Sequence, residues 1–259
     1  NNCDNAYLAA SCNGHIEAMK HLEGNGCDIH IMNNNGNNAY LVASISGQIE
    51  VMKYLEEKGF DINIKNKYGN NAYLVASINR QIEVMKHLEG NGCNINIVDE
   101  DGNNAYLLAS EYGQIGVMKY LEDRGFNINV KNNNGENAYL MASMNGQIEA
   151  MKYLEGKGFD INITNIYNSN AYLLASLNGQ IEVMVYLENK GFDINATNGG
   201  GDNAYLLASV GEQIEAMKHL EKKDYNIDIK NGKNAYLRAL KNGQTEVIDY
   251  LKDKIIMEK

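Results

Sequence analysis

Proline and tryptophan are absent from the 259 residues, and phenylalanine and cysteine occur only four times each. No continuous apolar run is long enough to span a bilayer, so a transmembrane helix is not expected. The few cysteines are unevenly placed and do not resemble the framework of a disulfide-stabilised domain; they are Cys3, Cys12, Cys27 and Cys93. The first residues also show no signal-peptide pattern, so we expect a reducing, cytoplasmic location.

Positive charge is in the minority, with 23 Lys and Arg against 33 Asp and Glu, which gives a formal net charge of −10. Such a chain lacks the basic surface that neutralises a row of phosphates, which argues against binding to nucleic acid. No glycine-rich phosphate loop lies between a strand and a helix, and no set of nucleophile, base and acid stands out. Apolar residues make up 44% of the chain, enough for a substantial core.

The chain contains an internal repeat. The tripeptide Asn-Ala-Tyr begins at Asn5, Asn38, Asn71, Asn104, Asn137, Asn170, Asn203 and Asn234. Successive copies start 33 residues apart, except the last, which starts 31 residues after its predecessor. Because a fixed period of this length is typical of stacked repeat proteins, we expect residues 1–259 to form one domain of eight copies.

The second copy shows how one unit is built. Asn38 is a strong N-cap residue and precedes the helix-forming stretch 39–44, and Gly47 interrupts the pattern as a helix-ending glycine does. In the stretch 48–58, apolar residues recur at helical spacing and predict a second helix with one buried face. An extended finger with a glycine-containing turn follows. Neither helix is long enough to be stable alone, so each copy must stack on the next.

This unit resembles the ankyrin repeat over essentially the whole chain, through the pattern G-x-x-A-x-L-x-A-S-x-x-G-Q-I-E-V-M-K-Y-L-E-x-x-G-x-D-I-N. The resemblance implies an all-α solenoid of eight helix–turn–helix units with short β-hairpin-like fingers. It also implies a non-enzymatic protein-binding role without a cofactor. Two departures stand out: Asn-Ala-Tyr-Leu replaces the family's Thr-Pro-Leu-His, and Glu replaces a leucine near the end of the second helix, as at Glu56. We expect the asparagine to keep the capping role and Tyr and Phe to fill the core.

Some slots vary between copies, and these are free of the stacking constraint. The slot after Ala-Ser holds Cys12, Ile45, Ile78, Glu111, Met144, Leu177, Val210 and Lys241. By the resemblance, it lines a concave groove that binds partner proteins, and its apolar members predict an interaction surface. Tyrosines in neighbouring variable positions add aromatic anchors. The predicted partner-binding residues are Ile45, Tyr68, Ile78, Tyr112, Met144, Tyr167, Leu177 and Val210. The alternative is that these side chains only cover the seams between copies.

The two ends of the chain differ. The last copy is more polar and predicts a C-terminal cap; its polar residues are Arg238, Lys241, Lys252 and Asp253. The first copy reads like an interior copy, so we expect further repeats or another domain to precede it. One alternative function is therefore the recognition arm of a larger enzyme, a channel or an effector that acts in a host cytosol. Another is end-to-end self-association through the first copy.

Two further patterns are the pairs of histidine and cysteine and the replacement of glycine in some turns. His21 with Cys27, and His87 with Cys93, lie six residues apart, but two ligands are too few for a metal site, so no metal is expected. Other exceptions replace glycine with a residue that has a side chain: Arg80 and Glu212 in the turn between helices, and Asp224 after a second helix. If these turns need a left-handed backbone, these copies are weaker than the others.

Overall fold

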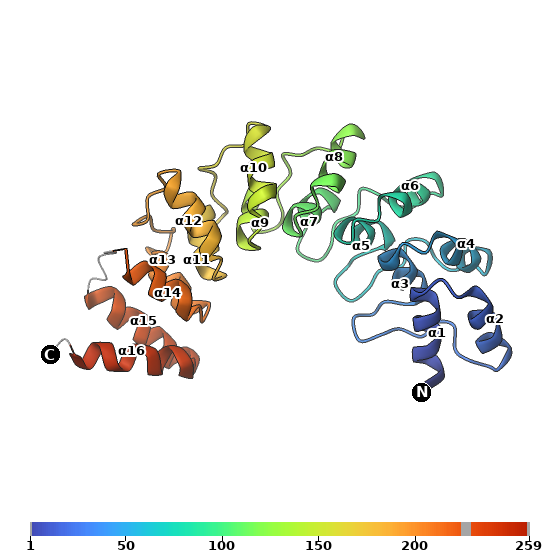
Figure 1. Ribbon diagram of the computed structural model, residues 1–259, viewed down its shortest axis with the longest axis horizontal. Coiled ribbons are helices and arrows are strands. Elements are labelled where there is room, and N and C mark those ends of the chain that lie inside the picture. Colours follow the sequence, from blue (N-terminus) through green and yellow to red (C-terminus); the bar gives the residue numbers. More distant parts are fainter. Residues whose placement is uncertain (1, 224–228, 258–259) are drawn as a thin grey trace. The chain divides into compact units, whose positions relative to one another are not determined.

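The computed structural model describes residues 2–223 and 229–257, with side chains for residues 5–223 and 234–252. Their regular secondary structure consists of paired helices (Figure 1), which are α1 (Asn2–Cys12), α2 (Ile16–Gly24), α3 (Ala39–Ser46), α4 (Ile49–Glu57), α5 (Ala72–Ile78), α6 (Ile82–Gly90), α7 (Ala105–Glu111), α8 (Ile115–Asp123), α9 (Ala138–Met144), α10 (Ile148–Gly156), α11 (Ala171–Leu177), α12 (Ile181–Asn189), α13 (Ala204–Val210), α14 (Ile214–Glu221), α15 (Ile229–Asn242) and α16 (Thr245–Met257). Within these ranges the extended structure is limited to one isolated antiparallel bridge, Thr197 with Asn203. The predicted all-α class is confirmed.

The chain divides into two compact units. The first comprises Asn1–Ala109 with Gln114–Asn133, and the second comprises Ser110–Gly113 with Asn134–Lys259. In the first unit α1, α3 and α5 pack in succession, and in the second α9, α11, α13 and α15 do the same. Each of these helices also contacts the second helix of its own copy, for example α3 with α4 and α11 with α12. The predicted stacking of copies is therefore present in each unit, and the single domain over 1–259 remains a prediction.

The buried positions of the core recur at the same place in successive copies of the repeat. In seven copies the tyrosine of Asn-Ala-Tyr is fully or almost fully buried: Tyr7, Tyr40, Tyr73, Tyr106, Tyr139, Tyr172 and Tyr205. In the second copy, Leu41, Met52 and Leu55 are fully buried as well. A buried tyrosine contributes a large apolar area but needs a partner for its hydroxyl group. The expectation that tyrosine fills the core is confirmed, whereas among the phenylalanines only Phe60 is buried and the other three are half-buried.

Asparagine caps the first helix in the six middle copies. In each, the side-chain oxygen of the asparagine accepts a hydrogen bond from the backbone N–H of the leucine three residues later, at 3.0 or 3.1 Å. The caps are Asn38, Asn71, Asn104, Asn137, Asn170 and Asn203. The first and last copies differ, because α1 and α15 begin upstream of the tripeptide and enclose Asn5 and Asn234. The expected cap is wrong there, since an asparagine inside a helix cannot cap its start.

The fingers are hairpin-like turns held by side chains. In the first finger, the Asn33 side-chain oxygen accepts from the N–H groups of Asn35 and Asn37, both at 3.0 Å, and the Asn33 N–H donates to the Asn37 carbonyl at 3.0 Å. Neighbouring tips are joined by single backbone bonds, such as Lys67 N–H to Asn35 O at 3.1 Å. The same link joins Ile166 to Asn134 in the second unit. The fingers are thus pre-formed, although no ladder of strands is present in the described residues.

The turn between the two helices of a copy requires a left-handed backbone. Gly47 has φ of 77°, and Arg80 and Glu212 keep this conformation with φ of 61° and 59°. A residue with a Cβ atom is strained there by roughly 1–2 kcal/mol. This supports the expectation for Arg80 and Glu212, whereas Asp224 lies outside the described residues.

Replacing Glu212 with glycine is therefore expected to stabilise the protein by about 0.5–1 kcal/mol, the strain relief being partly offset by greater freedom of the unfolded chain. Urea unfolding followed by circular dichroism measures the change. The same substitution at Glu215, in the first turn of α14, is the control and should destabilise by roughly 1 kcal/mol. Equal destabilisation by both variants would contradict the strain argument.

Candidate functional site

The first unit holds three of the predicted binding residues. Ile45 and Ile78 are half-buried at the ends of α3 and α5, and Tyr68 is 55% exposed on a finger tip. The backbone at this slot is tied to the next copy, because the Gln81 side-chain amide donates to the Ile45 carbonyl at 3.1 Å and that of Gln114 donates to the Ile78 carbonyl at 3.0 Å. The slot therefore borders a seam between copies, and both isoleucine side chains remain partly exposed to solvent.

The second unit holds the other five. Tyr112 and Tyr167 are 47% and 59% exposed, and Met144, Leu177 and Val210 are half-buried at the ends of α9, α11 and α13. Three of the five, Met144, Tyr167 and Leu177, line one cavity of about 680 Å³. Tyr112 and Val210 are not among its lining residues. The structure thus brings two helix-end positions and one finger-tip position together, and the binding role of the eight residues stays a prediction.

This cavity, named the finger cavity below, is lined by the first helices of three consecutive copies and by three consecutive fingers. Leu174 of α11 and Leu207 of α13, 4% and 8% exposed, contribute buried apolar side chains. Met144 and Leu177 line it from the helix ends, and the fingers 134–136, 165–169 and 198–200 complete it. Leu174 and Leu207 were missed from sequence. The available signal was the slot directly after Tyr-Leu, which is apolar but varied in seven copies.

One charged side chain, Glu136, lines the finger cavity. It occupies the position before the capping asparagine, where Asn103 of the first unit accepts a hydrogen bond from the Asn132 side chain at 3.0 Å. Glu136 accepts the equivalent bond from Asn165 at 3.3 Å and is 5% exposed. The substitution keeps the contact between fingers and adds a carboxylate to an otherwise apolar and amide-lined site.

The first unit has a smaller cavity of about 510 Å³ between its first two fingers. Its lining includes Met32, Lys65 and Lys67 together with backbone and amide groups of the fingers, and no residue of a first helix. It therefore lacks the apolar residues from helices that distinguish the finger cavity.

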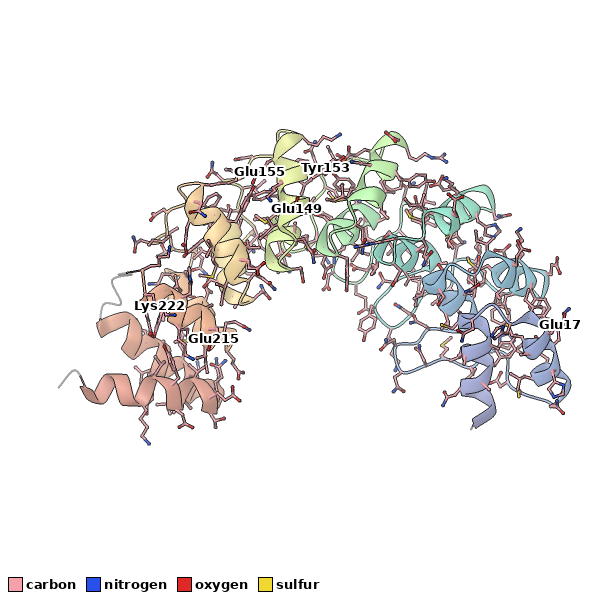
Figure 2. The ribbon with its side chains drawn as sticks, in the orientation of Figure 1. Glu17, Glu149, Tyr153, Glu155, Glu215 and Lys222 are labelled. Carbon is pink, nitrogen blue, oxygen red and sulfur yellow. The ribbon has the colours of Figure 1, made fainter. Side chains whose placement is uncertain are left out.

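The glutamate that replaces leucine near the end of the second helix forms a cluster of polar contacts between copies. Glu155 of α10 (Figure 2) accepts hydrogen bonds from Tyr139 at 3.0 Å and Tyr186 at 2.9 Å, and pairs with Lys190 at 2.7 Å. Tyr139 belongs to the same copy, whereas Tyr186 and Lys190 belong to the next. In the sequence this glutamate stands out only as a departure from the family pattern. The missed signal was the recurrence of tyrosine 16 residues before it and of tyrosine or histidine 31 residues after it.

These glutamate clusters recur along the chain and shift the pKa of their members. Burial, the largest single influence, raises the pKa of the Glu155 carboxyl, but the hydrogen bonds from Lys190, Tyr186 and Tyr139 outweigh it, so the pKa lies below its ordinary value. The pKa values of Glu23 and Glu188 are lowered in the same way. Burial, with the hydrogen bond to Glu89, raises the pKa of Tyr120 to about 12. Each cluster therefore holds a carboxylate against neutral phenols, and stabilises the contact between adjacent copies.

The histidine and cysteine pairs do not form joint sites. His87 contacts Glu56 at 2.8 Å, in the place that tyrosine occupies in other glutamate clusters. Cys93 is a buried free thiol whose pKa burial raises to about 11. Within the part of the chain that the structure describes, no group of three or more His, Cys, Asp or Glu side chains could hold a metal ion. Cys12 is also a free thiol, whereas Cys27 is disulfide-bonded.

Among the described residues, none of the helices combines the length and the apolar character needed to cross a bilayer.

The comparisons agree with the paired-helix architecture. The protein-family model that describes three copies of the ankyrin repeat matches residues 6–99 and 73–165 of the sequence. These two matches together span more than half of the chain. No curated protein matches the chain. Ankyrin repeats are generally protein–protein interaction modules, and the family is typically non-enzymatic. From the repeated helix pairs and this match, the chain belongs to the ankyrin repeat family.

Proposed function

We propose that the chain is a non-enzymatic, cytoplasmic scaffold that binds a partner protein along the groove formed by the ends of its first helices and its finger tips. The observation that carries this proposal is the finger cavity, where Met144 and Leu177 from two helix ends face the same space as Tyr167 from a finger tip. Exposed tyrosine beside apolar side chains is typical of the residues that dominate binding energy at protein interfaces.

Hydrogen bonds between copies support a binding surface that is pre-formed before a partner arrives. Side-chain amides of one copy hold the helix-end carbonyls of the copy before it, as Gln81 does at Ile45 and Gln244 does at Val210. The fingers are fixed by their asparagine turns and by the bonds between neighbouring tips. A surface that needs little ordering on binding retains more of its contact energy as affinity.

The test is a pull-down from cell lysate with three forms of the chain. The groove variant carries Ile45→Glu, Ile78→Glu, Met144→Glu and Leu177→Glu. The control variant carries Lys53→Gln, Lys86→Gln, Lys152→Gln and Lys218→Gln, which remove exposed lysines from second helices. Both variants lower the formal charge by four, so charge alone does not distinguish them. Circular dichroism first establishes that each form is folded.

A protein that is captured by the wild type and the control, and lost from the groove variant, is the expected result. Equal capture by all three forms would place binding on another face and contradict the proposal. Loss of folding in the groove variant would mean that these side chains belong to the seams. Light scattering over a range of concentrations tests end-to-end self-association separately, since a constant monomer mass rules out that alternative.

A further inference from the structure

The finger cavity exists because one finger tip has no side chains. At the two tip positions other fingers carry pairs such as Lys67 with Tyr68, whereas the sixth finger has Gly199 and Gly200. Both glycines line the cavity. On the neighbouring tip, Ile166 and Tyr167 are 63% and 59% exposed. The missing side chains therefore leave an opening beside two adjacent apolar groups that project into solvent.

The shape and lining of the cavity suit a large apolar side chain. Its volume of about 680 Å³ falls within the roughly 300–1,000 Å³ that is usual for ligand sites. Leu174, Leu207 and Met144 supply apolar surface from three first helices. The glycine finger is fixed, because the Gly199 N–H donates to the Tyr167 carbonyl at 2.8 Å and the Gly200 N–H donates to the Asn198 side chain at 2.9 Å.

The charge of the site favours a cation beside that apolar group. Glu136 is the charged residue of the lining, and no Lys, Arg or His is among the lining residues. A carboxylate has about four acceptor lone pairs, so Glu136 can hold the Asn165 amide and also accept from an incoming cation. The exposed ring of Tyr167 adds a face on which a guanidinium or ammonium group can stack. The net charge of −10 attracts a basic partner at longer range.

We propose that the finger cavity docks an extended segment of a partner protein in which a large aliphatic or aromatic residue lies next to a lysine or arginine. The apolar side chain enters between Ile166 and the glycine finger and contacts Leu174 and Leu207. The adjacent cation reaches Glu136. This inference rests on the proposed function, because it specifies which part of the groove recognises the partner and which chemistry it selects.

The test uses a phage-displayed library of random peptides, selected in parallel on the wild-type chain and three variants. Gly200→Tyr fills the cavity with the residue that Tyr68 and Tyr167 provide at the same slot. Asn35→Tyr is the matched control, since it makes the same tip change in the first unit. Glu136→Asn removes the charge and restores the residue that Asn103 provides at that slot. Circular dichroism establishes that all forms are folded.

The wild type is expected to enrich peptides with a Leu, Ile, Met or Phe next to a Lys or Arg. The leading peptide, labelled and titrated by fluorescence anisotropy, should bind Gly200→Tyr at least roughly tenfold more weakly and Asn35→Tyr unchanged. Glu136→Asn should weaken it roughly three- to tenfold and reduce its salt dependence.

Enriched peptides without a basic residue, or binding that survives Gly200→Tyr, would overturn the inference, as would the failure of the wild type to enrich any peptide family. The proposed function is judged separately by the groove pull-down. A partner that is lost from the groove variant but retained by Gly200→Tyr would leave the proposed function standing while this inference fails.

Discussion

Raising the pH above 10 is expected to unfold the protein cooperatively, because its buried tyrosines keep their protons only in the folded state. Burial, together with the glutamate that accepts each hydroxyl hydrogen bond, raises the pKa of these phenols well above the ordinary value; they are Tyr7, Tyr40, Tyr73 and Tyr139. Above pH 10 the folded state therefore binds more protons than the unfolded state, and the free energy of unfolding falls as the pH rises. Each of the four tyrosines lowers the free energy of unfolding by about 1.4 kcal/mol per pH unit above pH 10. Together they lower it by about 6 kcal/mol at pH 11.

This loss is comparable to the whole stability of a typical domain, so the transition should be sharp. Circular dichroism and tyrosinate absorbance, followed together between about pH 9 and pH 12, should report the loss of helix and the ionisation of the buried phenols in one step. Tyr40→Phe removes one of these groups and should reduce the pH dependence by about a quarter of the four-tyrosine effect. Ionisation of the buried phenols while the helices persist would contradict the prediction.

Replacing Glu155 with alanine is expected to cost about 3 kcal/mol, which is large for the removal of one charged residue. The substitution leaves the hydroxyl groups of Tyr139 and Tyr186 without their acceptor and removes the partner of Lys190. Buried groups that lose a charged partner keep their desolvation cost and gain nothing in return. Because these contacts join successive copies, the loss should weaken the stacking of α10 and α12.

The matched control lies on the same helix. Glu149 (Figure 2) pairs with Lys152 at 2.7 Å, but its side chain is 75% exposed. Glu149→Ala is therefore expected to change stability by less than about 0.5 kcal/mol. Urea unfolding of both variants gives the comparison, with Glu155→Gln as a milder change if Glu155→Ala does not fold. Similar losses at the two positions would mean that the contacts of Glu155 contribute no more than a surface ion pair.

The fold was predictable from a single sequence because the copies carry the same local signals. Asn38 and its equivalents predicted the starts of the middle first helices, and glycines such as Gly47 predicted the turns that follow. The ends were less predictable, since α15 begins at Ile229, five residues before Asn234, although Asn234 opens the same tripeptide. Residues before the tripeptide continue the helix there, so the local cap signal is not used.

The binding slots were only partly predictable. Variation between copies identified Met144, Tyr167 and Leu177, which line one cavity. It also selected Val210 and Tyr112, which do not line this cavity. Variation at a sequence position does not show whether the surface around that position is flat or hollowed. The depth of the finger cavity depends on the glycine finger of the next copy, 33 residues along the chain from the exposed tip at 166–167.

The sequence by itself determined the eight copies, the paired helices, their buried faces and the membership of a protein-binding family. Only the tertiary structure decided which side chains of successive copies meet. Periodicity assigns a residue to a face, but the partner on that face belongs to another copy and depends on how the copies stack. That is why Glu155 stands out in the sequence only as a departure from the family pattern, although it lies between two tyrosines and a lysine in the fold. It is also why two glycines in a finger become the opening of a cavity.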